Sequence, residues 1–170
     1  MESEMSPGYL SRCHEALKRL GAPLEGWYCS GVVDYGNAVF ECELCGYPAV
    51  RYVHIMVHKE YPAQVQVGCV CAGIMEGDIL AAKERDRQAK NRSARKSKYL
   101  QKHWEATEDN RWMIRHKHKT ITVERDSFRD REYYKIDIDG DQYHWKDNNR
   151  MSSFLVAQHY IFDIIDAEAK

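Results

Sequence analysis

The stretch of sequence that decides the fold runs from Cys42 to Asp78 and reads CELCGYPAVRYVHIMVHKEYPAQVQVGCVCAGIMEGD. It holds four of the chain's six cysteines, in two close pairs separated by a β-like run. Paired cysteines of this kind are typical of a protein that surrounds a metal ion with thiolates. The sequence therefore predicts a structural Zn²⁺ ion bound by Cys42, Cys45, Cys69 and Cys71.

Local patterns place the two pairs on different elements. Residues 42–46 read as a zinc knuckle, in which two intervening residues let both sulfurs face one ion and a glycine permits a left-handed turn. Residues 50–58 alternate as a strand, and residues 65–67 return as its partner after a turn. After Cys69 and Cys71, residues 72–75 begin a helix, which places the second pair near a positive helix N-terminus that favours thiolates.

Other ligand sets remain open at this stage. His54 and His58 lie on one face of the expected strand, and either could replace a cysteine. Four thiolates could also hold an iron–sulfur cluster, although nothing in the spacing asks for one. A catalytic zinc needs an open coordination position and a general base, and the H-x-E and P-C-x-x-C signatures of zinc deaminases are not in the sequence. A closed structural site is the prediction.

The order of knuckle, hairpin and two ligands at a helix start resembles the treble-clef zinc finger. The C-x-C second pair departs from the commoner C-x-x-C, so the likeness lies in the order of the elements. The segments CELCGYPAVRYVHIM and VGCVCAGIMEGD also resemble a family of small uncharacterised bacterial and phage proteins. This resemblance extends over most of the chain. That resemblance implies a cysteine-ligated zinc module and brings no activity with it.

The segment before the knuckle predicts a helix and a hairpin. Apolar residues recur at helical spacing after Ser6, which is the expected cap. Cys13 lies on the apolar face and is interpreted as a buried structural thiol. The chain then turns at Gly36 and Asn37, which predicts a β-hairpin with Cys29 as a core thiol.

Basic residues cluster after the module, although the formal net charge is only −1. Residues 83–104 hold nine basic and two acidic side chains, in a proline-free run of helix formers that predicts one long helix. Asp86–Lys90 is its single acid-to-base pair at a spacing of four, so a bound polyanion is expected to offset the repulsion. An acidic protein partner and a solvated spacer are the alternatives.

The expected phosphate contacts lie on this helix and on a later basic run. They are Lys83, Arg85, Arg87, Lys90, Arg92, Arg95, Lys96, Lys98, Arg115, Lys117 and Lys119.

The C-terminal part predicts a three-stranded antiparallel sheet with one helix, the last strand returning at Asp139-Gly140 and the helix capped by Ser152 or Ser153. In outline it is similar to the DNA-binding domains of integrase arms and to double-stranded-RNA-binding domains, by analogy and without a shared motif. The acidic residues 137–141 read as a hairpin turn, since a calcium loop needs its glycine two positions later.

The predicted fold class is α+β with three parts. Residues 1–78 form the N-terminal helix, hairpin and zinc module, residues 79–105 the basic connecting helix, and residues 106–170 the β-β-β-α domain. The apolar runs are too short for a transmembrane helix, and the acidic N-terminus lacks the basic region of a signal peptide. A cytoplasmic location, in a bacterial cell or a phage-infected host, is expected.

The expected function is zinc-stabilised, non-enzymatic binding of a nucleic-acid duplex, with DNA favoured over RNA and without membrane contact. One alternative is a protein-interaction module that docks on or inhibits a larger nucleoprotein complex. Another is a metal-dependent nuclease using His54, His58, Glu60 and the zinc. The helix after the second pair lacks the asparagine or histidine that ββα-metal nucleases need.

Overall fold

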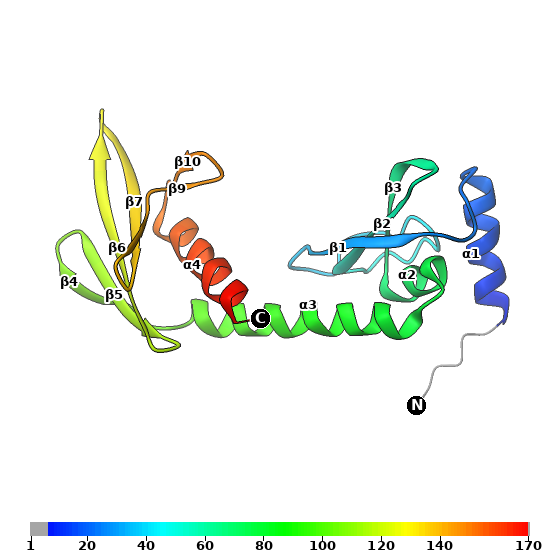
Figure 1. Ribbon diagram of the computed structural model, residues 1–170, viewed down its shortest axis with the longest axis horizontal. Helices are drawn as coiled ribbons and strands as arrows, with labels where there is room; N and C mark the ends of the chain where they lie inside the picture. The colour runs from blue at the N-terminus through cyan, green and yellow to red at the C-terminus, as the bar shows by residue number, and fades with distance from the viewer. Residues whose placement is uncertain (1–6, 170) are drawn as a thin grey trace. The chain divides into compact units, whose positions relative to one another are not determined.

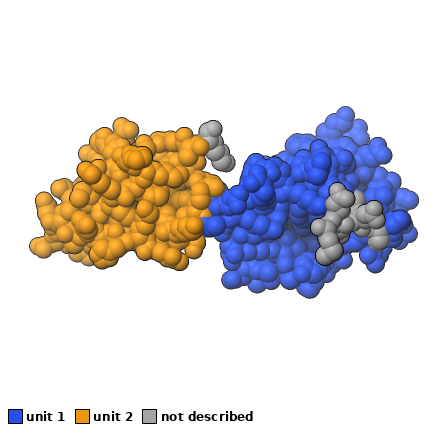
Figure 2. Space-filling model, turned by 90° about the horizontal axis from the view of Figure 1, so that it is seen from below, with its two compact units in different colours: residues 1–94 blue, residues 95–170 orange. Residues whose placement is uncertain are grey.

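The structure, a computed structural model, describes residues 7–169. These residues form four helices and ten strands in an α+β arrangement (Figure 1). The chain divides into two compact units, residues 1–94 and residues 95–170, which we call unit 1 and unit 2 (Figure 2). The cap expected at Ser6 lies outside the described residues. Among the helices of residues 7–169, none has the length and apolarity needed to cross a membrane.

Unit 1 is built on a three-stranded antiparallel sheet in the order β1-β2-β3. The strand β2 lies in the middle, and its side chains are buried or half-buried along its whole length. The elements are α1 (Pro7–Arg19), β1 (Tyr28–Asp34), β2 (Tyr52–His58), β3 (Tyr61–Val67), α2 (Cys69–Glu76) and the first part of α3 (Ile79–Leu100). The expected hairpin of β2 and β3, followed at once by a helix, is confirmed.

The hairpin expected around Gly36 and Asn37 is wrong. The strand β1 pairs with β2, from Tyr28 opposite Val57 to Asp34 opposite Tyr52. After the turn the chain forms an isolated bridge between Phe40 and Val50. The long central strand offers β1 a buried partner, whereas the short segment after the turn exposes Val39 by 68%. Burial beyond the local turn therefore decides the pairing.

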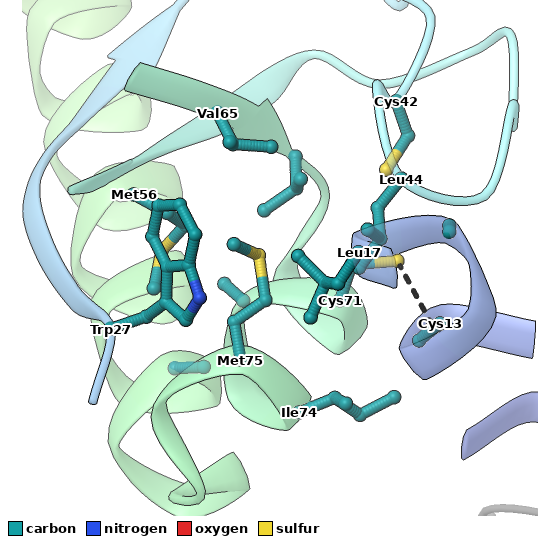
Figure 3. Packing of buried hydrophobic residues seen from close by; sticks show 14 of the residues in the cluster. Cys13, Leu17, Trp27, Cys42, Leu44, Met56, Val65, Cys71, Ile74 and Met75 are labelled. Carbon is teal, nitrogen blue, oxygen red and sulfur yellow. Dashed lines mark hydrogen bonds between the residues drawn. The ribbon is translucent and has the colours of Figure 1, made fainter. Parts of the chain in front are cut away.

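The core of unit 1 joins the sheet to α1 and α2 (Figure 3). Leu17 of α1, Met56 of β2 and Met75 of α2 are each at most 1% exposed. The turn from α2 to α3 depends on two glycines. Gly77 ends α2 in the left-handed conformation, with φ of 74°, and a Cβ on Gly73 would lie 2.8 Å from the Ile79 Cα. This close turn fixes the start of α3 against α2.

Unit 2 contains a five-stranded antiparallel sheet in the order β4-β5-β6-β7-β8, with α4 packed on one face (Figure 1). Its core includes Ile121, Ile136 and Ile161, each at most 1% exposed. The elements are β4 (Glu105–Glu108), β5 (Arg111–His116), β6 (Lys119–Phe128), β7 (Arg131–Ile138), β8 (Asp141–Tyr143), β9 (Trp145–Lys146), β10 (Asn149–Arg150) and α4 (Phe154–Glu168).

The three-stranded sheet expected here is therefore wrong, for two reasons. The turn between β5 and β6 is made by Lys117 and His118, at φ of 49° and 64°. It contains no glycine or asparagine, the residues that usually signal such a turn in a sequence. The edge strand β4 is exposed throughout and has no apolar alternation. By contrast, the Asp139-Gly140 turn and the Ser153 cap are confirmed.

Candidate metal centre

Three of the four predicted zinc ligands lie together in unit 1. The Sγ atoms of Cys42, Cys45 and Cys71 are all within 4.8 Å of one another. The sulfurs of a tetrahedral zinc–thiolate site, with Zn–S bonds near 2.3 Å, are about 3.8 Å apart. The three sulfurs are therefore spaced closely enough to share one metal ion. We call them the three-cysteine group.

Local backbone structure presents these sulfurs. The Cys42 carbonyl accepts a hydrogen bond from the Gly46 N–H at 2.8 Å, which closes the knuckle, and Gly46 adopts φ of 73°. The Gly68 N–H, just before α2, points at the Cys42 Sγ at 3.5 Å. Cys71 lies in the first turn of α2. Backbone N–H groups aimed at sulfur favour its thiolate form.

A fourth sulfur comes from α1. The Cys13 Sγ lies 4.0 Å from the Cys71 Sγ, a contact drawn as the dashed line in Figure 3. The Tyr9 hydroxyl, one helical turn earlier, lies 3.0 Å from the same sulfur. The sequence did carry a signal for this, since Tyr9 and Cys13 are four residues apart and so share one helix face. Interpreting Cys13 only as a buried structural thiol overlooked that its sulfur lies beside Cys71.

The thiols of this group crowd one another. The hydrogen bond with Cys71, and then burial, raise the pKa of Cys42. The contact with Cys13 is the largest influence that raises the pKa of Cys71. Several thiolates can therefore coexist here only with a positive charge among them. The donor set suits a soft or borderline divalent cation.

Cys69 lies in a different cluster. Ligand atoms of His54, Cys69 and Asp86 are within 4.8 Å of one another, and Cys69 does not belong to the three-cysteine group. Side chains two positions apart on a helix diverge by roughly 200°. The C-x-C pair therefore sends Cys71 towards α1 and Cys69 towards β2 and α3. We call His54, Cys69 and Asp86 the mixed cluster.

The two candidate histidines differ in their surroundings. His58 uses both ring nitrogens on backbone groups, with its Nε2 3.0 Å from the Glu25 carbonyl and its Nδ1 3.0 Å from the Glu60 N–H. His54 is fully buried, and its Nε2 lies 3.7 Å from the Asp86 Oδ1, too far for a hydrogen bond. His58 is thus a structural residue, whereas His54 faces other candidate ligands.

The cations of α3 have many acidic partners. The expectation of uncompensated repulsion is wrong, because acids outside the four-residue spacing also pair with them. Arg85 pairs with Glu76, Arg87 with Glu84 at 2.7 Å, Lys90 with Asp86 at 2.6 Å, Arg95 with Asp166 at 2.9 Å, and Lys96 with Asp163 at 3.6 Å. Arg92 also has an interaction partner, while Lys83 and Lys98 are exposed.

The basic residues from Arg115 to Lys119 likewise include both paired and exposed side chains. Lys119 pairs with Glu168 at 2.8 Å. Arg115 and Lys117 are exposed. Burial, followed by the charges of Lys102 and Lys117, lowers the pKa of His116, whose ring packs 5.1 Å from that of Tyr99. Lys102, His116 and Lys117 thus form a basic cluster within unit 2.

Comparisons with family models, curated proteins and solved structures find no match for this chain. The functional description of the molecule therefore depends on its own geometry. In unit 1 that geometry consists of the three-cysteine group with Cys13 beside it, and of the mixed cluster. In unit 2 it consists of the basic cluster.

Proposed function

We propose that unit 1 is a treble-clef-like zinc module whose metal ion holds its fold together. The observation that carries the proposal is the approach of Cys42, Cys45 and Cys71 to within 4.8 Å of one another. The knuckle supplies two of these sulfurs and the start of α2 supplies the third, after the β2–β3 hairpin. Zinc is the metal of choice for a closed thiolate site without redox function.

Cys13 is the fourth ligand that the proposal assigns. Its 4.0 Å separation from the Cys71 sulfur is close to the spacing of about 3.8 Å in a tetrahedral zinc–thiolate site. The Tyr9 hydroxyl would donate to the ligating Cys71 thiolate and orient it, as outer partners of metal ligands commonly do. Cys69, which the sequence favoured, is directed into the mixed cluster instead.

Such an ion would be structural because of the segments it connects. Its ligands come from α1, from the knuckle and from α2, which are separated along the chain by the whole sheet. A site of this kind does not persist in the unfolded chain, so the free energy of metal binding becomes free energy of folding. Unit 1 would then depend on zinc for stability.

The test is cobalt substitution in the full-length protein. Thiolate-to-cobalt charge-transfer absorption grows with the number of sulfur ligands. We expect the four-thiolate signature to weaken in Cys13→Ser and in Cys45→Ser. It should persist in the matched control Cys29→Ser, a cysteine on β1 outside the three-cysteine group. A four-thiolate spectrum that survives Cys13→Ser but is lost in Cys69→Ser would restore the ligand set expected from sequence.

A second candidate function, nucleic-acid binding, is supported by the basic cluster of unit 2. After burial, the positive charges of Lys102 and Lys117 lower the pKa of His116. A phosphate between them would relieve this repulsion. Among the contacts expected from sequence in unit 2, Lys98, Arg115 and Lys117 fit best, because they are exposed and are not in the ion pairs described above.

This candidate is tested by the salt dependence of binding to a DNA duplex. Each phosphate contact contributes about 0.9 to the slope of log affinity against log salt. Lys102→Glu with Lys117→Glu should therefore lower affinity and reduce the slope by about 2. Lys59→Glu, at an exposed lysine of unit 1, is the matched control. Equal binding by both variants would count against this surface.

A further inference from the structure

The mixed cluster joins three different ligand types from three elements of unit 1. His54 comes from β2, Cys69 from the first residue of α2, and Asp86 from α3. Their ligand atoms lie within 4.8 Å of one another. An imidazole nitrogen, a thiolate and a carboxylate are all established zinc ligands. The cluster shares no residue with the three-cysteine group, so it does not depend on the zinc module proposed above.

The state of His54 points independently to a missing partner. Its side chain is fully buried, and within residues 7–169 its Nε2 has no hydrogen-bond partner. The nearest acidic oxygen, the Asp86 Oδ1, is 3.7 Å away. A buried polar atom without a partner is uncommon in a folded protein and often marks a bound ion. This nitrogen is on the side of the ring that faces Asp86.

The other side of the cluster holds its ligands in place. The Asp86 Oδ2 pairs with the Lys90 Nζ at 2.6 Å, which leaves the Oδ1 directed towards His54. The His54 Nδ1 lies 4.0 Å from the Cys29 Sγ, on the opposite edge of the ring. Outer contacts of this kind commonly orient metal ligands. The neighbouring cation Arg85 is itself neutralised by Glu76.

A pocket of about 460 Å³ opens beside the cluster. Cys69 and Asp86 are part of its wall, which also contains the three-cysteine group and the tyrosines Tyr9, Tyr47 and Tyr52. The Lys90 Nζ lies 5.9 Å from the centre of the Tyr52 ring. Ligand pockets commonly enclose 300–1,000 Å³ and combine apolar or aromatic walls with a few polar groups. This one combines three tyrosines with the cations Arg51 and Lys90 and with candidate ligands of both metal clusters.

We propose that His54, Cys69 and Asp86 bind a second Zn²⁺ ion whose fourth coordination position faces this pocket and accepts the carboxylate of a small aromatic acid. Three protein ligands with one exchangeable position are the pattern of an open zinc site, in contrast to a closed four-thiolate site. Cys69 and Asp86 supply two negative charges that balance the ion. The tyrosine rings provide the surface on which an aromatic body stacks.

Metal stoichiometry is the first test. The full-length protein, loaded with Zn²⁺ and passed through a desalting column, should carry two zinc ions per chain by mass spectrometry under native conditions. Asp86→Asn and Cys69→Ser should each carry one, and so should Cys45→Ser, which affects the other site. Glu84→Gln, an acid on the same helix that pairs with Arg87, should retain two. His54→Ala is less suitable because this residue is part of the core.

Ligand exchange at the open position is the second test. The Co²⁺-loaded protein is titrated with benzoate and, separately, with acetate. Benzoate should change the visible cobalt spectrum at a concentration at least tenfold lower than acetate. The change should be absent in Cys69→Ser and present in Glu84→Gln.

Two results would overturn the proposal. One is a single zinc ion per chain that Cys69→Ser and Asp86→Asn retain and Cys45→Ser loses, which would leave the zinc module intact. The other is a second ion whose cobalt spectrum neither anion alters, which would mean a closed site. Loss of both ions in Cys45→Ser alone would instead indicate that unit 1 had unfolded, and a circular dichroism spectrum decides whether that variant counts.

Discussion

At the scale of single residues, Tyr9 and Cys13 bring α1 to the edge of the three-cysteine group. The Tyr9 hydroxyl is 3.0 Å and the Cys13 sulfur 4.0 Å from the Cys71 sulfur. Burial, followed by the hydrogen bonds with Cys45 and Cys71, raises the pKa of Tyr9, so that its hydroxyl stays protonated. Tyr9 is thus a hydrogen-bond donor to sulfur.

Tyr9→Phe should weaken metal binding without removing a ligand. Loss of an outer hydrogen bond to a metal ligand typically costs 10–100-fold in affinity, and we expect a loss of about tenfold here. Competition with a chromophoric chelator measures it. Tyr47→Phe, an exposed tyrosine that lines the same pocket, is the control and should bind as the unchanged protein does. Equal affinity in both variants would exclude this role.

Arg95 illustrates a residue whose interpretation changes with structure. The sequence assigned it to phosphate contact, yet its guanidinium makes two hydrogen bonds to the Asp166 carboxylate, at 2.9 and 3.1 Å. Asp166 is 3% exposed. Arg95 therefore ties the end of α3 to α4 within unit 2.

Arg95→Ala should consequently destabilise unit 2, by about 2 kcal/mol, since hydrogen bonds to charged groups contribute roughly 1.5–3 kcal/mol. Urea unfolding followed by circular dichroism measures the change. Lys98→Ala, at an exposed position one turn further along the helix, should change the free energy of unfolding by less than about 0.5 kcal/mol. A stable Arg95→Ala protein that binds DNA less tightly would support the original phosphate assignment.

At the scale of elements, the sequence predicted what local patterns determine. The knuckle of Cys42 and Cys45, the β2–β3 hairpin and a helix after the second cysteine pair were predicted from spacing and alternation, although α2 begins earlier than expected, at Cys69. The approach of Cys13 to the Cys71 sulfur was not predicted, because packing across the core brings them together. The β5–β6 turn was missed because Lys117 adopts a positive φ without the residues that usually signal one.

The histidines of β5 and α4 predict a pH dependence of unit 2. Burial, then Lys102 and Lys117, lower the pKa of His116, and burial, then Lys96, lower that of His159. The unfolded chain, with histidine pKa values near 6.5, therefore takes up protons before the folded unit does. The stabilisation is complete above about pH 6.5 and is lost as the pH falls through the folded pKa values.

The free energy of unfolding of unit 2 should thus fall between pH 7.5 and pH 5, as urea titrations at several pH values would show. The double variant His116→Gln, His159→Gln should show a shallower fall. If the free energy of unfolding of this variant falls just as steeply with pH, groups other than the two histidines cause the effect. If phosphate binds the basic cluster, DNA should also raise the pKa of His116, which NMR titration of the ring protons reports.

At the scale of the whole molecule, each unit has its own core. The core of unit 1 contains Trp27, 3% exposed, and that of unit 2 contains Trp104, 9% exposed. The proposed metal ligands all belong to unit 1. On the proposals above, metal binding would therefore stabilise unit 1 and leave unit 2 unaffected.

Chelation should reveal this division. A strong chelator added to the zinc-loaded protein should raise the rate of amide hydrogen exchange in α1, the knuckle and α2, where metal binding contributes to folding. Exchange in β5, β6 and β7 should stay unchanged. Hydrogen-exchange mass spectrometry measures both sets of peptides. Faster exchange in both units would mean that they unfold together. Unchanged exchange in both units would contradict a structural role of the metal.

The single valine between Cys69 and Cys71 has a consequence for how the chemistry of this protein could diversify. One more residue at that point would turn the second cysteine by roughly a further 100° about the helix, so that both thiols face nearly the same way. The chain would then present the commoner C-x-x-C spacing and gather its sulfurs around one ion. A one-codon insertion could exchange a two-ion protein for a one-ion scaffold, and its reversal could free a cysteine for new reactivity. On the two proposals above, the angular positions of the cysteines about α2 would set how many metal ions unit 1 binds.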